Sequence, residues 1–278
     1  MPLFSFRLVA GASGLASLVF AVSAQAANVG LAAHRAVYDL VLDQAAQTPD
    51  LADMNGRIVM EFSGSECGGY SVALRFVTEI SDQDGDLRIT DARTTTHESG
   101  SGADFKFTNE TFVDDTLAEE SRGRANRTDT GVSVALTKPG KKKLLLDKSV
   151  VFPTEQIARI IEAANRDQNF LQIDVYDGSE DGETVYATTV VVGAETFDSH
   201  DIGDELAAKE AGVAGLKHWS VVVSYFNQES RGEQTPIYVM SFVLYENGVS
   251  RHIKIDYGDF AILGRLAALE MLPKAHCP

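Results

Sequence analysis

Hydrophobic and polar residues alternate along most of the chain with the two-residue period of half-buried β-strands. Runs rich in Val, Ile, Thr, Tyr and Phe are separated by short clusters of Gly, Asp, Asn and Ser, which favour turns. We therefore expect about a dozen strands in succession. Single strands are expected at residues 35–42, 57–62, 70–80, 86–99, 104–112, 170–178, 182–193, 218–227 and 260–269.

Two further stretches predict β-hairpins from the chemistry of their turns. GVSVALTKPGKKKLLLD places Pro139 and Gly140 between two apolar runs, and this pair predicts a type II turn. IYVMSFVLYENGVSRHIKIDY holds Asn247 and Gly248 between two alternating runs, as a type I′ turn favours. We interpret the lysines beside the first turn as side chains of a solvated turn.

One segment has the period of an α-helix instead. After Pro153, apolar residues recur at i, i+3, i+4 and i+7, which predicts a helix over residues 154–166 with Thr154 as its cap. Its apolar positions are Ile157, Ile160, Ile161 and Ala164. The predicted fold is therefore mainly β: a large antiparallel sheet that must curl, close or fold over, with one amphipathic helix packed on it.

The first 26 residues have the features of a secretory signal peptide. A short n-region with Arg7 precedes the apolar run LVAGASGLASLVFAV, and Ala24 and Ala26 supply a small-residue cleavage site. We expect cleavage near Ala26/Ala27, export to the periplasm, and one β-rich domain over residues 27–278, which contain no repeat, linker or membrane-spanning run. An uncleaved membrane anchor is the alternative.

Composition narrows the choice of partners. The formal net charge is −16 at pH 7, and an acidic protein repels nucleic acid and anionic head groups. We therefore exclude nucleic acid as a partner.

The predicted export indicates the redox state of the two cysteines, Cys67 and Cys277. In an oxidising compartment two cysteines predict one disulfide, and closing a loop of about 210 residues contributes ~5 kcal/mol in the chain-entropy model. A redox pair and a metal site are the alternatives, but there is no C-x-x-C motif, and His276 beside Cys277 is a weak metal signal.

Two acidic clusters are candidates for further chemistry. Asp82, Asp84 and Asp86 resemble half of a calcium loop, but Gly85 is the fourth residue instead of the sixth and no glutamate stands at the end of the loop, which favours a β-turn. A second cluster could hold zinc or form an acid–base site, or it could be a solvated acidic loop: Asp198, His200, Asp201 and Asp204.

The sequence also lacks the common catalytic patterns. The expected mature chain contains no G-x-S-x-G, H-E-x-x-H, Walker or Rossmann pattern, and the other histidines are scattered singly. We therefore expect no enzymatic activity, no catalytic residue, no cofactor and no bound metal.

Several segments in the same order resemble the cell-envelope integrity protein family typified by EipB, which comprises alphaproteobacterial periplasmic proteins. They are HRAVYDL, GRIVMEFSGSECGGY, RFVTEI, YDGSEDGETVYATTVVVG, TPIYVMSFVLYENGVSRHIKIDYGDF and the terminal cysteine. The resemblance implies a long sheet wound into a spiral, a helix packed on it, and a disulfide from the tail to an early segment. It also implies a role in upkeep of the cell envelope without an assigned reaction.

Two functions follow as hypotheses. The first is a disulfide-stabilised scaffold that binds another periplasmic or envelope protein; a helical-repeat partner of the tetratricopeptide type would suit a broad curved sheet. The second is a carrier whose curled sheet encloses a lipid or the acyl chain of a lipoprotein. The 14 Phe, 8 Tyr and 1 Trp could fill such an interior or line it.

Overall fold

The computed structural model describes residues 30–46, 51–197, 202–227, 235–275 and 277, so the expected signal peptide lies outside the described residues. The dominant element is one antiparallel sheet of 14 strands. These are β1 (His34–Leu42), β2 (Leu51–Ser65), β3 (Gly69–Asp82), β4 (Leu87–Glu98), β5 (Asp104–Val113), β6 (Thr116–Thr128), β7 (Gly131–Lys138), β8 (Lys142–Leu146), β9 (Phe170–Val175), β10 (Tyr186–Val192), β11 (His218–Asn227), β12 (Tyr238–Tyr245), β13 (Ser250–Asp256) and β14 (Ala261–Met271).

The strand order shows how the sheet extends from a central pair. β1 pairs with both β2 and β14, and consecutive strands continue to β8 on one flank and to β9 on the other. Because β8 and β9 are the two edges, the sheet is not closed. The predicted fold class, mainly β and antiparallel, is confirmed.

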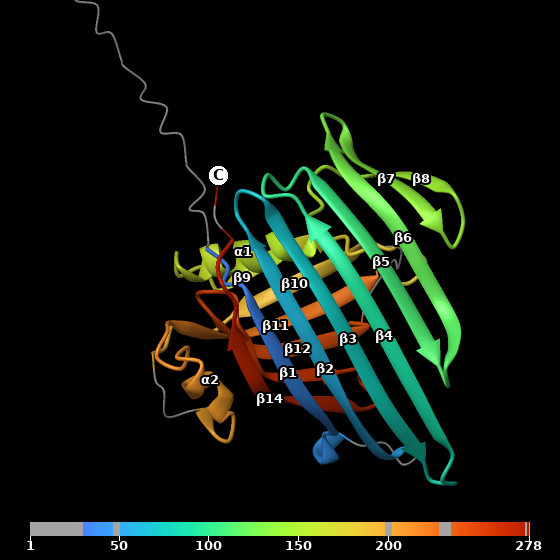
Figure 1. Cartoon of the computed structure of the whole chain (residues 1–278), viewed down its shortest axis with the longest axis vertical. Helices are drawn as coiled ribbons and strands as arrows, with labels where there is room; N and C mark the ends of the chain where they lie inside the picture. The colour runs from blue at the N-terminus through green and yellow to red at the C-terminus, as the bar shows by residue number, and fades with distance from the viewer. Residues whose placement is uncertain (1–29, 47–50, 198–201, 228–234, 276, 278) are drawn as a thin grey trace, which may run out of the picture.

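The sheet curls so that its flanks face each other. In Figure 1, β2 to β6 cross in front of β9 to β12, with α1 (Pro153–Ala164) near one end. One cluster of buried side chains joins both flanks to α1, and it includes Tyr38 of β1, Trp219 of β11, and Ile160 and Ile161 of the helix. The apolar face that the sequence predicted for the helix therefore closes part of the interior.

A second cluster of buried side chains joins the β5–β7 part of the sheet to the β9 edge. Phe105 of β5 stacks on Phe152, with ring centroids 4.9 Å apart, and Phe107 meets Tyr176 edge-on at 5.7 Å. Val151 forms a parallel bridge with Val175 at the end of β9. The segment before α1 thus joins the β9 edge and holds the curl through aromatic contacts.

Strand β6 was not predicted, because its sequence, TLAEESRGRANRT, has no apolar alternation. Its inward positions are small residues that face the aromatic cluster, including Gly123 and Ala125. A Cβ atom at Gly123 would lie 2.7 Å from the Phe107 ring. The strand forms because small residues make room for rings, which hydrophobic periodicity does not detect.

Both predicted hairpins are present, but both turn types were wrong. A type II turn needs a positive φ at Gly140, which that residue does not have. A type I′ turn needs positive φ at Asn247 and Gly248, and only Gly248 has it, at 87°. The Gly248 N–H donates to Tyr245 O at 2.9 Å, as in a three-residue loop built on a type I turn.

The helices also differ in detail from the prediction. α1 begins one residue earlier than predicted and ends at Ala164, and Thr154 is not its cap, since Phe152 stands at that position without a side-chain bond. Two short helices, η1 (Gln44–Ala46) and α2 (Leu206–Glu210), lie in stretches where no helix or strand was predicted. Within the described residues, no helix has the length and apolarity needed to cross a membrane.

Candidate functional site

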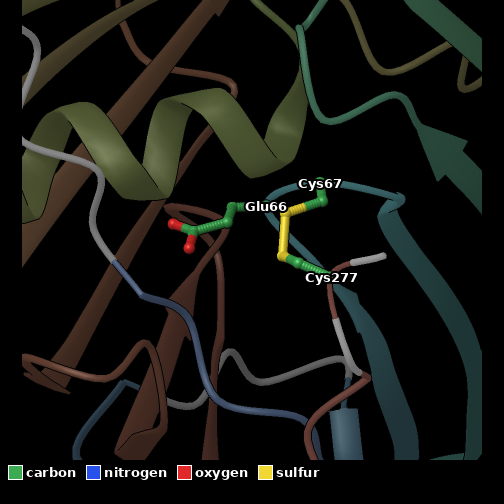
Figure 2. Close-up of side chains that lie close together, drawn as sticks. All are labelled: Glu66, Cys67 and Cys277. Atoms are coloured by element: carbon green, nitrogen blue, oxygen red, sulfur yellow. A yellow bond between two sulfur atoms is a disulfide. The ribbon is translucent and has the colours of Figure 1, made fainter.

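The two cysteines meet at one end of the sheet. Cys67 lies in the turn between β2 and β3, and Cys277 lies beyond β14; their Sγ atoms are bonded and their Cα atoms are 5.6 Å apart (Figure 2). The tail runs beside β1, where the Leu272 N–H donates to Ala33 O at 2.8 Å. The bond therefore connects the last strand to the β2–β3 turn across β1.

A carboxylate beside this disulfide raises the question of a metal. Ligand atoms of Glu66, Cys67 and Cys277 lie within 4.8 Å of one another. Cysteine binds zinc as a thiolate, whereas both sulfurs here share a disulfide bond, and Figure 2 shows the Glu66 side chain extending away from them. The geometry therefore matches a covalent staple better than a metal centre.

A groove of about 480 Å³ opens next to the staple, between the first turn of α1 and the β2–β3 and β4–β5 connections. Six of its fourteen lining residues are charged: Glu66, Glu98, Arg127, Glu155, Arg159 and Glu162. Helix N-termini bind anions through free N–H groups, so the state of these groups decides what the groove can bind.

Those N–H groups are already bonded to Glu98. Its carboxylate, buried at the end of β4, accepts hydrogen bonds from the backbone N–H of Thr154 at 3.0 Å and of Glu155 at 3.2 Å. Burial raises the pKa of Glu98 to about 7, although the two N–H groups favour the charged form. The helix terminus is therefore occupied by a residue of the sheet.

Arg127 completes this junction. Its guanidinium donates to Gly102 O at 2.8 Å, to Val150 O at 2.9 Å and to the Glu155 carboxylate at 2.5 Å. The groove thus lies over a cross-linked joint between β4, β6 and α1, and Glu98, Arg127 and Glu155 are used within the fold.

The first acidic cluster forms a tight turn. Asp82 Oδ1 accepts from the N–H groups of Asp84 at 3.0 Å and Asp86 at 2.9 Å, and the Gly85 N–H donates to Asp82 O at 3.2 Å. Because backbone donors occupy the carboxylate, the geometry favours the β-turn interpretation over the calcium loop.

The second acidic cluster is only partly described. Asp198, His200 and Asp201 lie outside the described residues, and Asp204 forms an exposed ion pair with Arg265 at 2.7 Å. The described part therefore gives no support for a zinc or acid–base site.

Next to Asp204, sequence reasoning missed a buried ion pair. Glu205 Oε2 lies 3.4 Å from Arg251 Nη1, and both side chains are 1% exposed. Glu205 Oε1 also accepts from the backbone N–H of His252 at 2.9 Å and of Leu266 at 2.8 Å. This pair fixes the start of α2 against β13 and β14, and no local motif signals it.

The described histidines do not form a catalytic set. His34 and His218 are buried, and each donates from Nδ1 to the carbonyl two residues before it, at 2.7 and 2.8 Å. Burial lowers the pKa of His34. His97 Nδ1 lies 2.9 Å from Ser71 Oγ, but this pair stands on the outer face of β3 and β4, and no carboxylate bonds to the imidazole in the described part of the chain.

Aromatic side chains contribute to the core on the inner face. Tyr225 of β11 stacks on Tyr238 of β12 with centroids 4.4 Å apart, and Tyr186 meets Tyr225 edge-on at 6.1 Å. Trp219 and Tyr38 are about 1% exposed. The rings face one another, so they pack as a core.

Comparison with known proteins agrees with this architecture. The family model described as EipB-like matches residues 25–273. The cell envelope integrity protein EipB of Brucella abortus (strain 2308) is 39% identical over 269 residues, which cover 95% of this chain and 94% of that protein. A crystal structure of a beta-barrel-like protein of a domain of unknown function from Brucella abortus has a TM-score of 0.81 at 39% identity, covering 87% of this chain and 99% of that one. The chain therefore belongs to the EipB-like family.

Proposed function

We propose that the protein supports the integrity of the cell envelope from the periplasm, as a non-enzymatic scaffold that binds another envelope protein. The main observation is its similarity to a protein named for cell envelope integrity, at 39% identity over 95% of this chain. Because the match covers 95% of this chain and 94% of that protein, the similarity is not confined to one segment of the fold.

A scaffold role agrees with how the polar groups are used. Glu98 caps α1, Glu205 pairs with Arg251, and both carboxylates are buried and hydrogen-bonded within the fold. Groups committed in this way hold elements together, whereas catalysis needs a group presented to a substrate.

The staple supports the same role. Cys67 and Cys277 cross-link the β2–β3 turn to the tail, which keeps the end of β14 fixed beside β1. A scaffold must hold its surface in one shape, and a cross-link between distant segments limits how the sheet can open. A helical-repeat protein remains the partner class that suits such a broad curved surface.

The carrier alternative receives less support. The inner face is packed with aliphatic and aromatic side chains, and six of the fourteen residues that line the groove beside the staple are charged. Acyl chains prefer enclosed apolar cavities. Native mass spectrometry of the protein, purified gently from its own periplasm, separates the two functions: a bare oxidised chain supports the scaffold, and a lipid-sized adduct contradicts it.

Deletion of the gene tests the envelope role itself. We expect the deletion strain to become sensitive to detergent and to antibiotics that act on the cell wall. Unchanged survival under both stresses would contradict the proposal.

A further inference from the structure

We propose that the outer face of strands β5 to β8 is a docking surface for an acidic segment of a partner protein. Its centre is a row of three cations, Lys106, Arg124 and Lys143. The inference rests on the proposed function only in taking the partner to be a protein.

Strand register places the three cations in one line. Lys106 of β5 lies opposite Arg124 of β6, Arg124 lies opposite Ala135 of β7, and Ala135 lies opposite Lys143 of β8. All four residues are exposed, and the strands that hold them form the green flank of the sheet in Figure 1. At about 4.8 Å per strand the row is roughly 14 Å long.

These cations lack neutralising partners, unlike their neighbours. Within the described residues, none of Lys106, Arg124 and Lys143 forms an ion pair, whereas Arg122 and Lys138 share Glu120 at 3.3 and 2.9 Å. Like charges directly opposite each other on adjacent strands destabilise a sheet. The unneutralised positive row therefore destabilises this part of the sheet, although the formal net charge of the chain is −16. An anionic partner would remove that destabilisation.

Net charge favours a compact acidic segment over a membrane. A membrane with anionic lipids is an extended surface, and it would repel the rest of this acidic chain. A short segment touches only the row, and Leu145, which follows Lys143 by two residues and is 65% exposed, offers it an apolar contact at the sheet edge.

The spacing of the row defines the segment that would fit. A helix rises about 1.5 Å per residue, so carboxylates at i, i+3 and i+10 lie about 4.5 and 15 Å along its axis and on one face. These positions match Lys106, Arg124 and Lys143 in turn. The test probe is a synthetic helical peptide of about 14 residues with Glu at these three positions, and its control peptide has Gln there.

The experiment measures peptide binding to the mature chain by fluorescence anisotropy. We expect binding of the Glu peptide to weaken at least about tenfold in the Lys106→Glu/Arg124→Glu/Lys143→Glu variant, and on raising NaCl from about 25 to about 250 mM. The matched control, Arg88→Glu/Lys209→Glu/Lys274→Glu, changes the net charge equally at exposed sites and should stay within about twofold of wild type. The Gln triple variant at the three row positions removes charge without adding repulsion and should also lose binding.

Several outcomes would overturn the inference: no binding of the Glu peptide, equal binding of the Gln peptide, equal loss in both Glu variants, or preferential binding to phosphatidylglycerol vesicles, which would make the face a membrane surface. The deletion phenotype is independent of these results. A sensitive deletion strain together with no peptide binding removes the docking surface and leaves the proposed function intact. A deletion strain without a phenotype removes the proposed function whatever the peptide does.

Discussion

Glu98, the last residue of β4, caps helix α1 by accepting a hydrogen bond of 3.0 Å from the backbone N–H of Thr154, 56 positions further along the chain. The local residue at the cap position, Phe152, has no side chain that could do this. The helix that closes the interior therefore depends on a carboxylate supplied by the sheet.

Removing this cap should destabilise the protein. Glu98→Ala leaves two N–H groups of the first turn without their acceptor, so we expect a loss of about 1–2 kcal/mol in the free energy of unfolding. Glu98→Gln keeps an acceptor and should lose less at neutral pH. Urea denaturation of both variants checks this; equal losses would show that the acceptor is unimportant.

The same residue predicts a pH dependence. The folded protein holds the pKa of Glu98 at about 7, above its ordinary value of 4.5, so folding takes up a proton between these pH values. Stability from this group is fully present below pH 4.5 and is lost as the pH rises to about 7, by up to about 3 kcal/mol. Melting temperatures across this range should fall more steeply for wild type than for Glu98→Gln, and parallel curves would contradict the assignment.

The staple should contribute measurably to stability. We expect Cys67→Ser, Cys277→Ser and the double variant to lose a similar 2–5 kcal/mol, roughly the cost of opening a native disulfide. A reductant should lower the melting temperature of wild type and leave the serine variants unchanged. If the reductant affects all of them equally, its action does not pass through this bond.

The buried ion pair should behave differently from the exposed one beside it. Arg251→Met leaves the Glu205 carboxylate buried without its counter-charge, and about 3–5 kcal/mol should be lost. Arg265→Met breaks the pair with Asp204, whose side chain is 63% exposed, and should cost less than about 1 kcal/mol. Similar losses in the two variants would contradict the structural role given to Glu205.

Packing around strand β6 gives a steric prediction. Gly123→Ala places a methyl group 2.7 Å from the Phe107 ring and 3.0 Å from Ala135 O, so we expect a loss of about 1–3 kcal/mol. Gly140→Ala is the matched control, because no atom lies within 4 Å of its added Cβ. If both substitutions are equally tolerated, β6 does not pack against the aromatic cluster as described.

These residues also show which features a sequence can predict. Strands with alternating faces and the helix containing Ile160 and Ile161 were predictable, because burial of one face imposes a period on the local sequence. β6 was not predicted, because its inner face is made of small residues that pack against the rings of another strand. The turn types were wrong because loop length, not the dipeptide alone, sets the backbone angles.

The buried polar contacts were harder to predict from the sequence than the strands and the helix. With only two cysteines in a chain that we expect to be exported, a single pairing is available, so Cys67 and Cys277 could be named from sequence. Glu98 and Glu205 look like ordinary acidic residues until the fold buries them, and their partners lie 56 and 46 positions away. Long-range burial of this kind leaves no local signal.

The most direct test of the account is complementation of a strain that lacks the gene, assayed by survival on detergent. One plasmid supplies the full chain and the other supplies residues 27–278 behind a start codon, so that the second product lacks the expected signal peptide. We predict that the full chain restores survival and the truncated chain does not. A deletion strain that survives like wild type, or rescue by both chains, would contradict a role in the envelope outside the cytoplasm.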